Sequence, residues 1–129
     1  MVNVRISCPV YPSESDELVL EAVMRIFPEA SVSRTDEGFE GVAEDIETFS
    51  LLIRRQKILD AARSVVFGGM CDDKTSFTLN KQAASVGKVS FCPENTVLGA
   101  IKVYLEGENL EDFIDKMLPR TIDGQEVTS

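Results

Sequence analysis

Basic side chains gather in the middle of the chain, where their chemistry could serve a negatively charged ligand. Residues 54–88 hold seven basic and three acidic residues, a balance of +4, whereas the other residues hold six basic and 19 acidic ones, a balance of −13. The densest run is Arg54-Arg55-Gln56-Lys57. Arginine matches a phosphate with its planar fork, and lysine acts as a point charge. The run therefore favours phosphate binding, although a solvated face or salt bridges to the acidic residues would explain it equally well.

The segment from Asn80 to Lys88 is the most unusual stretch of the sequence. Asn80, Lys81 and Gln82 supply hydrogen-bond donors, the alanines that follow permit close approach of a partner, and Gly87 can adopt a positive φ. The segment lacks the glycine spacing of a phosphate-binding loop, and its Gly87-Lys88 pair is followed by valine instead of serine or threonine. We therefore expect a binding segment without nucleotide hydrolysis.

The composition excludes several classes of catalytic and metal site. The chain has no histidine, so it lacks imidazole acid–base chemistry and histidine-ligated metals. Its three cysteines, Cys8, Cys71 and Cys92, match no zinc motif, and neighbouring carboxylates such as Asp72 and Asp73 do not share one face. We expect no enzyme activity, no metal and no cofactor.

The same composition indicates where the protein works. An odd number of cysteines and an N-terminus unlike a signal peptide indicate a reducing, cytoplasmic environment. No apolar run approaches the roughly 20 residues of a membrane span, so we expect no membrane association.

Hydrophobic periodicity predicts the elements that position these residues. Alternation predicts strands over residues 2–10, 30–35, 39–43, 75–79, 88–91 and 100–105. Helical spacing predicts helices over 13–27, 45–66 and 109–118, with Ser13, Asp45 and Asn109 as N-caps. The apolar stripe changes face at residues 54–57, which predicts a bend or two short helices, and 80–85 should form a loop or one helical turn.

One α+β domain accounts for this order of elements. The strands are mostly amphipathic, which is typical of an antiparallel sheet with helices packed on one face. We expect a single domain over residues 1–129, with a flexible tail after about residue 123. The open face of the sheet should be polar and mildly basic, because the outward strand positions are Asn3, Arg5, Ser7, Thr78, Lys88, Ser90, Lys102 and Tyr104. Such a face can bind phosphates and stack a base on tyrosine, or it can simply be solvated.

Several segments resemble an archaeal group catalogued as uncharacterised protein family 0201, which is placed under an RNA-binding heading. The matching segments are Leu51 to Arg63, Leu79 to Ala84 with Val86 to Val89, Leu118 to Thr121 with Asp123-Gly124, the opening strand, the turn at Pro12 and the helix end Ile26-Phe27-Pro28. The resemblance implies a fold like that of the ribosomal protein that grips 5S RNA. It supplies no catalytic residues, and the net charge of −9 departs from a typical ribosomal RNA binder.

Three functions remain open at this stage. The first is a nonenzymatic RNA-binding domain with the contact residues Arg54, Arg55, Lys57, Asn80, Lys81, Gln82, Lys88 and Tyr104. The second is a protein-interaction or homodimerisation module without RNA, built on the small residues at 83–84 and the open sheet face. The third is an enzyme of unknown reaction, which would need a deep pocket enclosing Arg54 or Lys81 beside a carboxylate of raised pKa.

Overall fold

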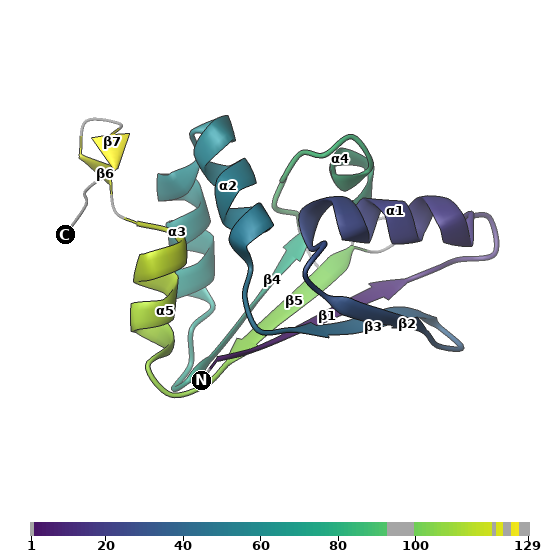
Figure 1. Cartoon of the computed structure of the whole chain (residues 1–129), viewed down its shortest axis with the longest axis horizontal. Helices are drawn as coiled ribbons and strands as arrows, with labels where there is room; N and C mark the ends of the chain where they lie inside the picture. Colours follow the sequence, from purple (N-terminus) through teal and green to yellow (C-terminus); the bar gives the residue numbers. More distant parts are fainter. Residues whose placement is uncertain (1, 93–99, 120, 123–124, 127–129) are drawn as a thin grey trace.

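The chain folds around one antiparallel sheet with helices on a single face (Figure 1). The computed structural model describes residues 2–92, 100–119, 121–122 and 125–126. The strands are β1 (Asn3–Pro9), β2 (Ser31–Arg34), β3 (Gly38–Ala43), β4 (Lys74–Leu79) and β5 (Ile101–Glu106). Their order in the sheet is β2-β3-β1-β5-β4, and every neighbouring pair is antiparallel. The predicted fold class is confirmed.

Strict alternation gives the neighbouring strands β1 and β5 one buried face. Val4 and Ile6 of β1 lie opposite Leu105 and Val103 of β5, and all four side chains are buried beneath the helices. The intervening residues therefore point to the other face, because side chains alternate along a strand.

Helices cover the apolar face of the sheet and close the core. They are α1 (Asp16–Ile26), α2 (Glu47–Gln56), α3 (Leu59–Gly68), α4 (Lys81–Ser85) and α5 (Leu110–Met117), followed by the short strands β6 (Thr121–Ile122) and β7 (Gln125–Glu126). The ring of Phe49 on α2 stacks on Phe27 and on Phe77 of β4, with centroids 5.6 and 5.5 Å away. These rings join the helical layer to the sheet. No helix in the described part of the chain is long and apolar enough to cross a membrane.

The predicted interruption of the long helix is confirmed. Helix α2 ends at Gln56, and Lys57 adopts the left-handed conformation with φ of 59° before α3 begins at Leu59. Each helix can then bury its own apolar stripe. Of the two alternatives left open for 80–85, a loop or one helical turn, the structure has the helix, because α4 begins after Asn80 and ends at Ser85.

Several local predictions were wrong. The N-cap of α1 is Ser15, not Ser13, and the N-cap position of α2 is Ile46, not Asp45. Asn109 does precede α5, but its side chain makes no capping hydrogen bond. Residues 88–91 form no strand and contribute one isolated bridge, between Phe91 and Leu79. The tail expected after residue 123 lies largely outside the described residues.

Candidate functional site

The segment around α4 mainly stabilises the fold. The Asn80 side chain accepts a hydrogen bond from the backbone N–H of Ala83 at 2.9 Å, which caps the helix. Ala84 is fully buried, and Gly87 adopts the positive φ of 75° that its sequence context predicted. Gln82 is the one exposed residue of the three predicted donors, Asn80, Lys81 and Gln82. The small residues thus serve packing within the chain.

Lys81 does not face solvent, which corrects its placement in a solvent-facing patch. Only 8% of the residue is exposed, and its Nζ donates to the Glu14 carboxylate at 2.9 Å and to the Pro9 carbonyl at 2.5 Å. The ammonium also lies 5.2 Å from the centre of the Tyr11 ring. A buried and paired lysine is unsuited to a passing phosphate, because its charge is already satisfied by neighbouring groups. Lys81 instead ties α4 to the segment between β1 and α1.

Three other predicted cations remain exposed where α2 ends beside the segment after α4. The Gln56 side chain accepts from the backbone N–H of Val89 at 2.7 Å and donates to its carbonyl at 2.9 Å. These two hydrogen bonds join the chain at Gln56 to the chain at Val89, so Arg55 and Lys57, which flank Gln56, and Lys88, which precedes Val89, belong to adjacent segments. Within the described chain, none of these three side chains forms an ion pair with a carboxylate. We call Arg55, Lys57 and Lys88 the basic corner.

Arg54 lies apart from the basic corner. Its half-buried side chain lines a hollow of ≈ 260 Å³ towards the end of α5, together with Ser50 and Met117. The Ser50 hydroxyl donates to the Met117 carbonyl, so α2 and α5 are held together there. The structure therefore separates Arg54 from its sequence neighbour Arg55.

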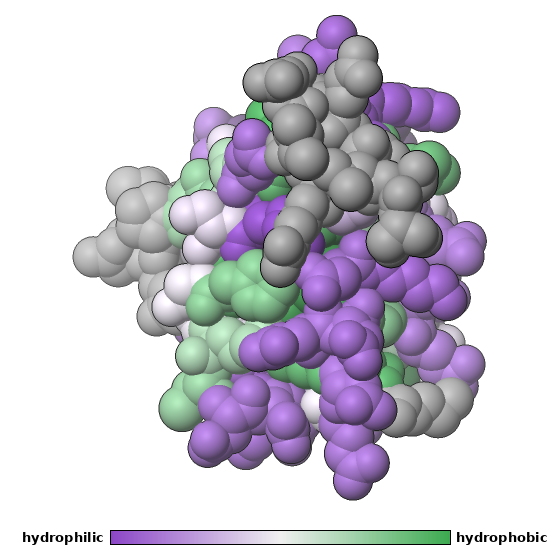
Figure 2. Space-filling view, turned by 90° about the vertical axis from the view of Figure 1, so that its left-hand side faces the viewer, coloured by the Kyte–Doolittle hydropathy of each residue, from purple (hydrophilic) through white to green (hydrophobic). Residues whose placement is uncertain are grey.

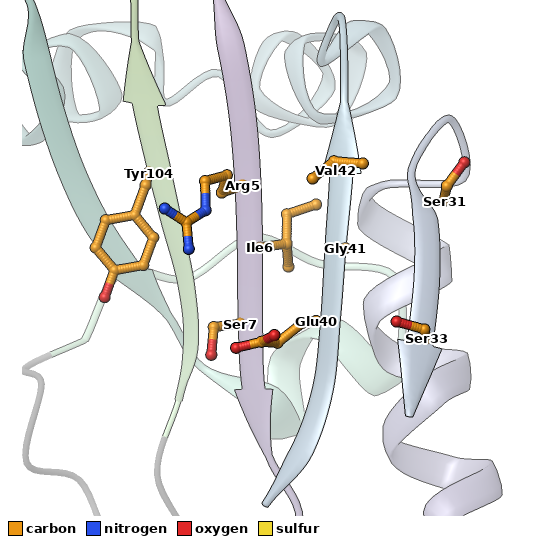
Figure 3. Close-up of a pocket in the computed structure, with 9 residues that line it drawn as sticks. All are labelled: Arg5, Ile6, Ser7, Ser31, Ser33, Glu40, Gly41, Val42 and Tyr104. Atoms are coloured by element: carbon orange, nitrogen blue, oxygen red, sulfur yellow. The ribbon is translucent and has the colours of Figure 1, made fainter. Parts of the chain in front are cut away.

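A second polar surface lies on the helix-free face of the sheet. The register places Arg5 of β1 directly between Val42 of β3 and Tyr104 of β5, and 41% of Tyr104 is exposed. A groove of ≈ 260 Å³ crosses this face, and Figure 3 shows the Arg5 side chain reaching towards Tyr104. Its lining residues are Arg5, Ile6, Ser7, Ser31, Ser33, Glu40, Gly41, Val42 and Tyr104.

The prediction of which residues lie on the open face was right for β1 and β5 and wrong for Thr78, Lys88 and Ser90. Arg5, Lys102 and Tyr104 share this face as predicted, and the register places Lys102 opposite Ser7. Thr78 is buried there, because its hydroxyl donates to the Cys92 carbonyl, and Lys88 and Ser90 are not in a strand.

Sequence reasoning missed the part of the groove formed by β2 and β3. Ser31, Ser33 and Glu40 line it because β3 pairs with both β1 and β2. Alternation within 30–35 and 39–43 could have revealed these residues, but only after the pairing of the strands was known.

The predicted contact residues therefore fall into separate places. The basic corner belongs to the helical layer, whereas Tyr104 lies on the opposite, helix-free side of the sheet. Figure 2 shows a third region, the end of the molecule where α3 and α5 lie, and hydrophilic residues cover much of that surface beside a smaller hydrophobic area. Such a mixed surface is ordinary for a solvated domain.

The thiol of Cys8, which interacts electrostatically with Lys81 and Glu14, is unreactive. Burial raises the pKa of Cys8 from 9.0 to about 11, and Lys81 lowers it and Glu14 raises it by smaller amounts. The thiol is therefore protonated at neutral pH and is a poor nucleophile. No group of three or more cysteine, aspartate or glutamate side chains in the described chain is arranged to hold a metal ion.

Comparison with known proteins gives relatives among archaea, although no family model matches the chain. A protein of Archaeoglobus fulgidus named UPF0200/UPF0201 is 39% identical over 129 residues, which are 98% of this chain and 40% of that longer protein. A UPF0201 protein of Sulfurisphaera tokodaii is 34% identical over 96% of this chain and 92% of its own length. The chain belongs to the UPF0201 family.

Solved structures support the UPF0201 assignment. The crystal structure of the Methanococcus jannaschii UPF0201 protein matches with a TM-score of 0.87 at 38% identity, over 98% of this chain and 99% of that chain. An Archaeoglobus fulgidus protein described as DUF54 shares the fold alone, with a TM-score of 0.65 at 22% identity. The likeness to the 5S-RNA-binding ribosomal protein stays a prediction, and the family names state no activity.

Proposed function

We propose that this UPF0201 protein binds RNA and that the basic corner is its contact for phosphates. The observation that carries the proposal is that three exposed cations, none of them in an ion pair within the described residues, lie next to the Gln56–Val89 hydrogen bonds. In a chain with so many carboxylates, cations without a carboxylate partner are available to an external anion.

The acidic remainder of the molecule shapes how such binding would work. The net charge of −9 disfavours a phosphate backbone over much of the surface, so RNA should bind only where cations without carboxylate partners are exposed, as at the basic corner. Three phosphate contacts give modest affinity and a dependence on salt, with a log–log slope of about −0.7 for each phosphate of a single strand. We therefore expect an RNA binder of moderate strength that loses its ligand readily as salt rises.

The test compares two variants of equal net charge. The corner variant carries Arg55→Gln, Lys57→Gln and Lys88→Gln, and the control carries Arg25→Gln, Lys74→Gln and Lys116→Gln, which are exposed cations elsewhere. Fluorescence anisotropy with a labelled RNA hairpin, at 50 and 200 mM salt, measures affinity. We expect the corner variant to bind at least about tenfold more weakly at low salt and its salt slope to fall by about 2, because three phosphate contacts are lost.

The control variant measures how much the net charge of the protein, apart from the basic corner, contributes to RNA affinity. We expect its affinity to change by less than about threefold, because surface charges beyond a Debye length are screened. If both variants lose affinity equally, a local phosphate site at the corner is excluded. If the wild-type protein binds no RNA at 50 mM salt, the proposed function is wrong.

A further inference from the structure

We propose that the groove on the helix-free face of the sheet holds one unpaired ribonucleotide, with its base stacked on Tyr104 and its phosphates on Arg5 and Lys102. This inference rests on the proposed RNA binding, but it assigns a separate surface and a specific form of the ligand. The groove lies across β1, β2, β3 and β5 (Figure 3). This face is opposite the helical layer that carries the basic corner.

Tyr104 offers a partly exposed aromatic ring on the helix-free face. Its ring belongs to an outward position of β5, and 41% of the residue is exposed. Its neighbour on β4 is the short Ser76, whereas its neighbour on β1 is the long Arg5. A ring that is open on the Ser76 side suits stacking with any base, because every base has a π face.

Two cations flank this ring at a spacing suited to consecutive phosphates. Arg5 is directly opposite Tyr104, and Lys102 is two residues from Tyr104 along the same strand. Diagonal neighbours of this kind on one face lie about 7–8 Å apart. Neither cation forms an ion pair within the described residues. Both charges are therefore available to a backbone that runs along β1 and β5.

Glu40 gives the groove its selectivity. It lies opposite Ser7, and Figure 3 shows its carboxylate extending from β3 across β1 towards Ser7. A carboxylate repels phosphates, which keeps the backbone on the side of Arg5 and Lys102. It accepts hydrogen bonds from hydroxyls, so it favours the 2′-hydroxyl of a ribose. The same groove should therefore discriminate against DNA.

A second copy of the chain is the competing occupant of this face. Val42 and Tyr104 are exposed hydrophobic residues here, at 58% and 41%. The rest of the lining is polar or backbone-like, with Arg5, Glu40 and three serines, and the surface is hollowed by ≈ 260 Å³. A stable dimer needs a broad complementary area with an apolar centre, whereas a small hollow rich in hydroxyls suits one polar unit of a ligand, such as a single nucleotide. The observations favour the nucleotide.

The experiment uses fluorescein-labelled hexauridylate and its 2′-deoxy counterpart as probes, with the full chain. We expect Tyr104→Ala to weaken RNA binding about 5- to 100-fold, because an aromatic stacking partner is lost, and Tyr104→Phe to bind within about twofold of wild type. We expect Glu40→Gln to lower the preference for RNA over DNA. Tyr104 and Glu40 are exposed, so both variants should keep the wild-type circular dichroism spectrum.

The outcomes separate this inference from the proposed function. If hexauridylate binding is lost in the corner variant but is unchanged in Tyr104→Ala, the protein binds RNA and the groove assignment is wrong. Equal affinity of the wild-type protein for the two probes overturns the role of Glu40. Sedimentation supplies a further check: a wild-type dimer that becomes monomeric in Tyr104→Ala assigns this face to a second copy and overturns the inference.

Discussion

Two lysines of one segment, Lys81 and Lys88, have opposite surroundings although only seven positions separate them. Lys81 is 8% exposed and is held by the Glu14 carboxylate and the Pro9 carbonyl. Lys88 is exposed and has no carboxylate partner within the described residues. A count of basic residues treats the two as equal, but only Lys88 can meet an external anion.

The path of the backbone creates this difference. Lys81 is the first residue of α4, where the chain comes close to the turn between β1 and α1. At Gly87 the chain reverses with a positive φ, and the N–H of Lys88 bonds back to the carbonyl of Ala83. One lysine therefore lies inside the fold and the other outside it, and charge that is available for binding depends on tertiary contacts.

The largest expected effect comes from replacing Lys81, the buried one of the two lysines. Lys81→Met leaves the Glu14 side chain, which is 14% exposed, without its cation and leaves the Pro9 carbonyl without its donor. Removing one partner of a buried ion pair costs about 3–5 kcal/mol. We expect a loss of that size in the free energy of unfolding, measured by urea denaturation at pH 7.

The matched control for this prediction is Lys88→Met, which should change the free energy of unfolding by less than about 0.5 kcal/mol because the side chain is solvated. A double variant, Lys81→Met with Glu14→Leu, should recover part of the stability, since apolar residues can replace a buried pair. Equal stabilities for Lys81→Met and Lys88→Met would contradict the contrast between the two positions.

The second prediction concerns Cys8, whose burial in the same region should make the free energy of unfolding depend on pH. Its pKa is raised from 9.0 to about 11 because the thiol is buried, so the unfolded chain releases this proton at a lower pH than the folded chain does. The thiol's contribution to stability is therefore fully present below pH 9 and is lost as pH rises towards 11. A shift of this size corresponds to about 2–3 kcal/mol.

Urea denaturation of wild type and Cys8→Ala at several pH values from 7 to 11 measures this contribution. Both proteins share the titration of their lysines, so only the difference between them reports on the thiol. We expect the wild-type protein to lose more stability than Cys8→Ala between pH 9 and pH 11. Parallel pH profiles would show that Cys8 is solvated in the folded protein.

Much of the fold could be predicted because local patterns determine it. Alternation gave the central strands β1 and β5, and the change of apolar face in 54–57 gave the break at Lys57. The predicted strand at 88–91 failed for a tertiary reason: Val89 bonds to the Gln56 side chain, which lies in a helix, instead of to a neighbouring strand.

The candidate site was harder to predict than the fold. Glu14 and Lys81 are separated by 67 positions, so no local pattern reveals that one neutralises the other. The sequence also could not show that Tyr104 and the basic corner lie on opposite sides of the sheet, because this depends on which layer receives α2. Residue types were sufficient to nominate cations, but burial and pairing determined which of them are available.

The smallest expected effect concerns Lys57, an exposed residue whose backbone favours another amino acid. Its φ of 59° places it in the left-handed region, where a Cβ is strained and glycine is not. We expect Lys57→Gly to raise the free energy of unfolding by up to about 1 kcal/mol, measured by urea denaturation. Lys57→Ala should be less stable than Lys57→Gly, because it keeps the Cβ in the same conformation.

These two variants also separate backbone strain from charge at the basic corner. Both remove the same cation, so both should weaken binding of the RNA hairpin by a similar factor, about two- to threefold, although their stabilities differ. Lys81 and Lys57 would then be opposite cases: the largely buried Glu14 carboxylate requires a cation at position 81, whereas at position 57 the cation serves binding and glycine would fold better. Equal stabilities of Lys57→Gly and Lys57→Ala would show that the left-handed turn imposes no strain, and the contrast would reduce to exposure alone.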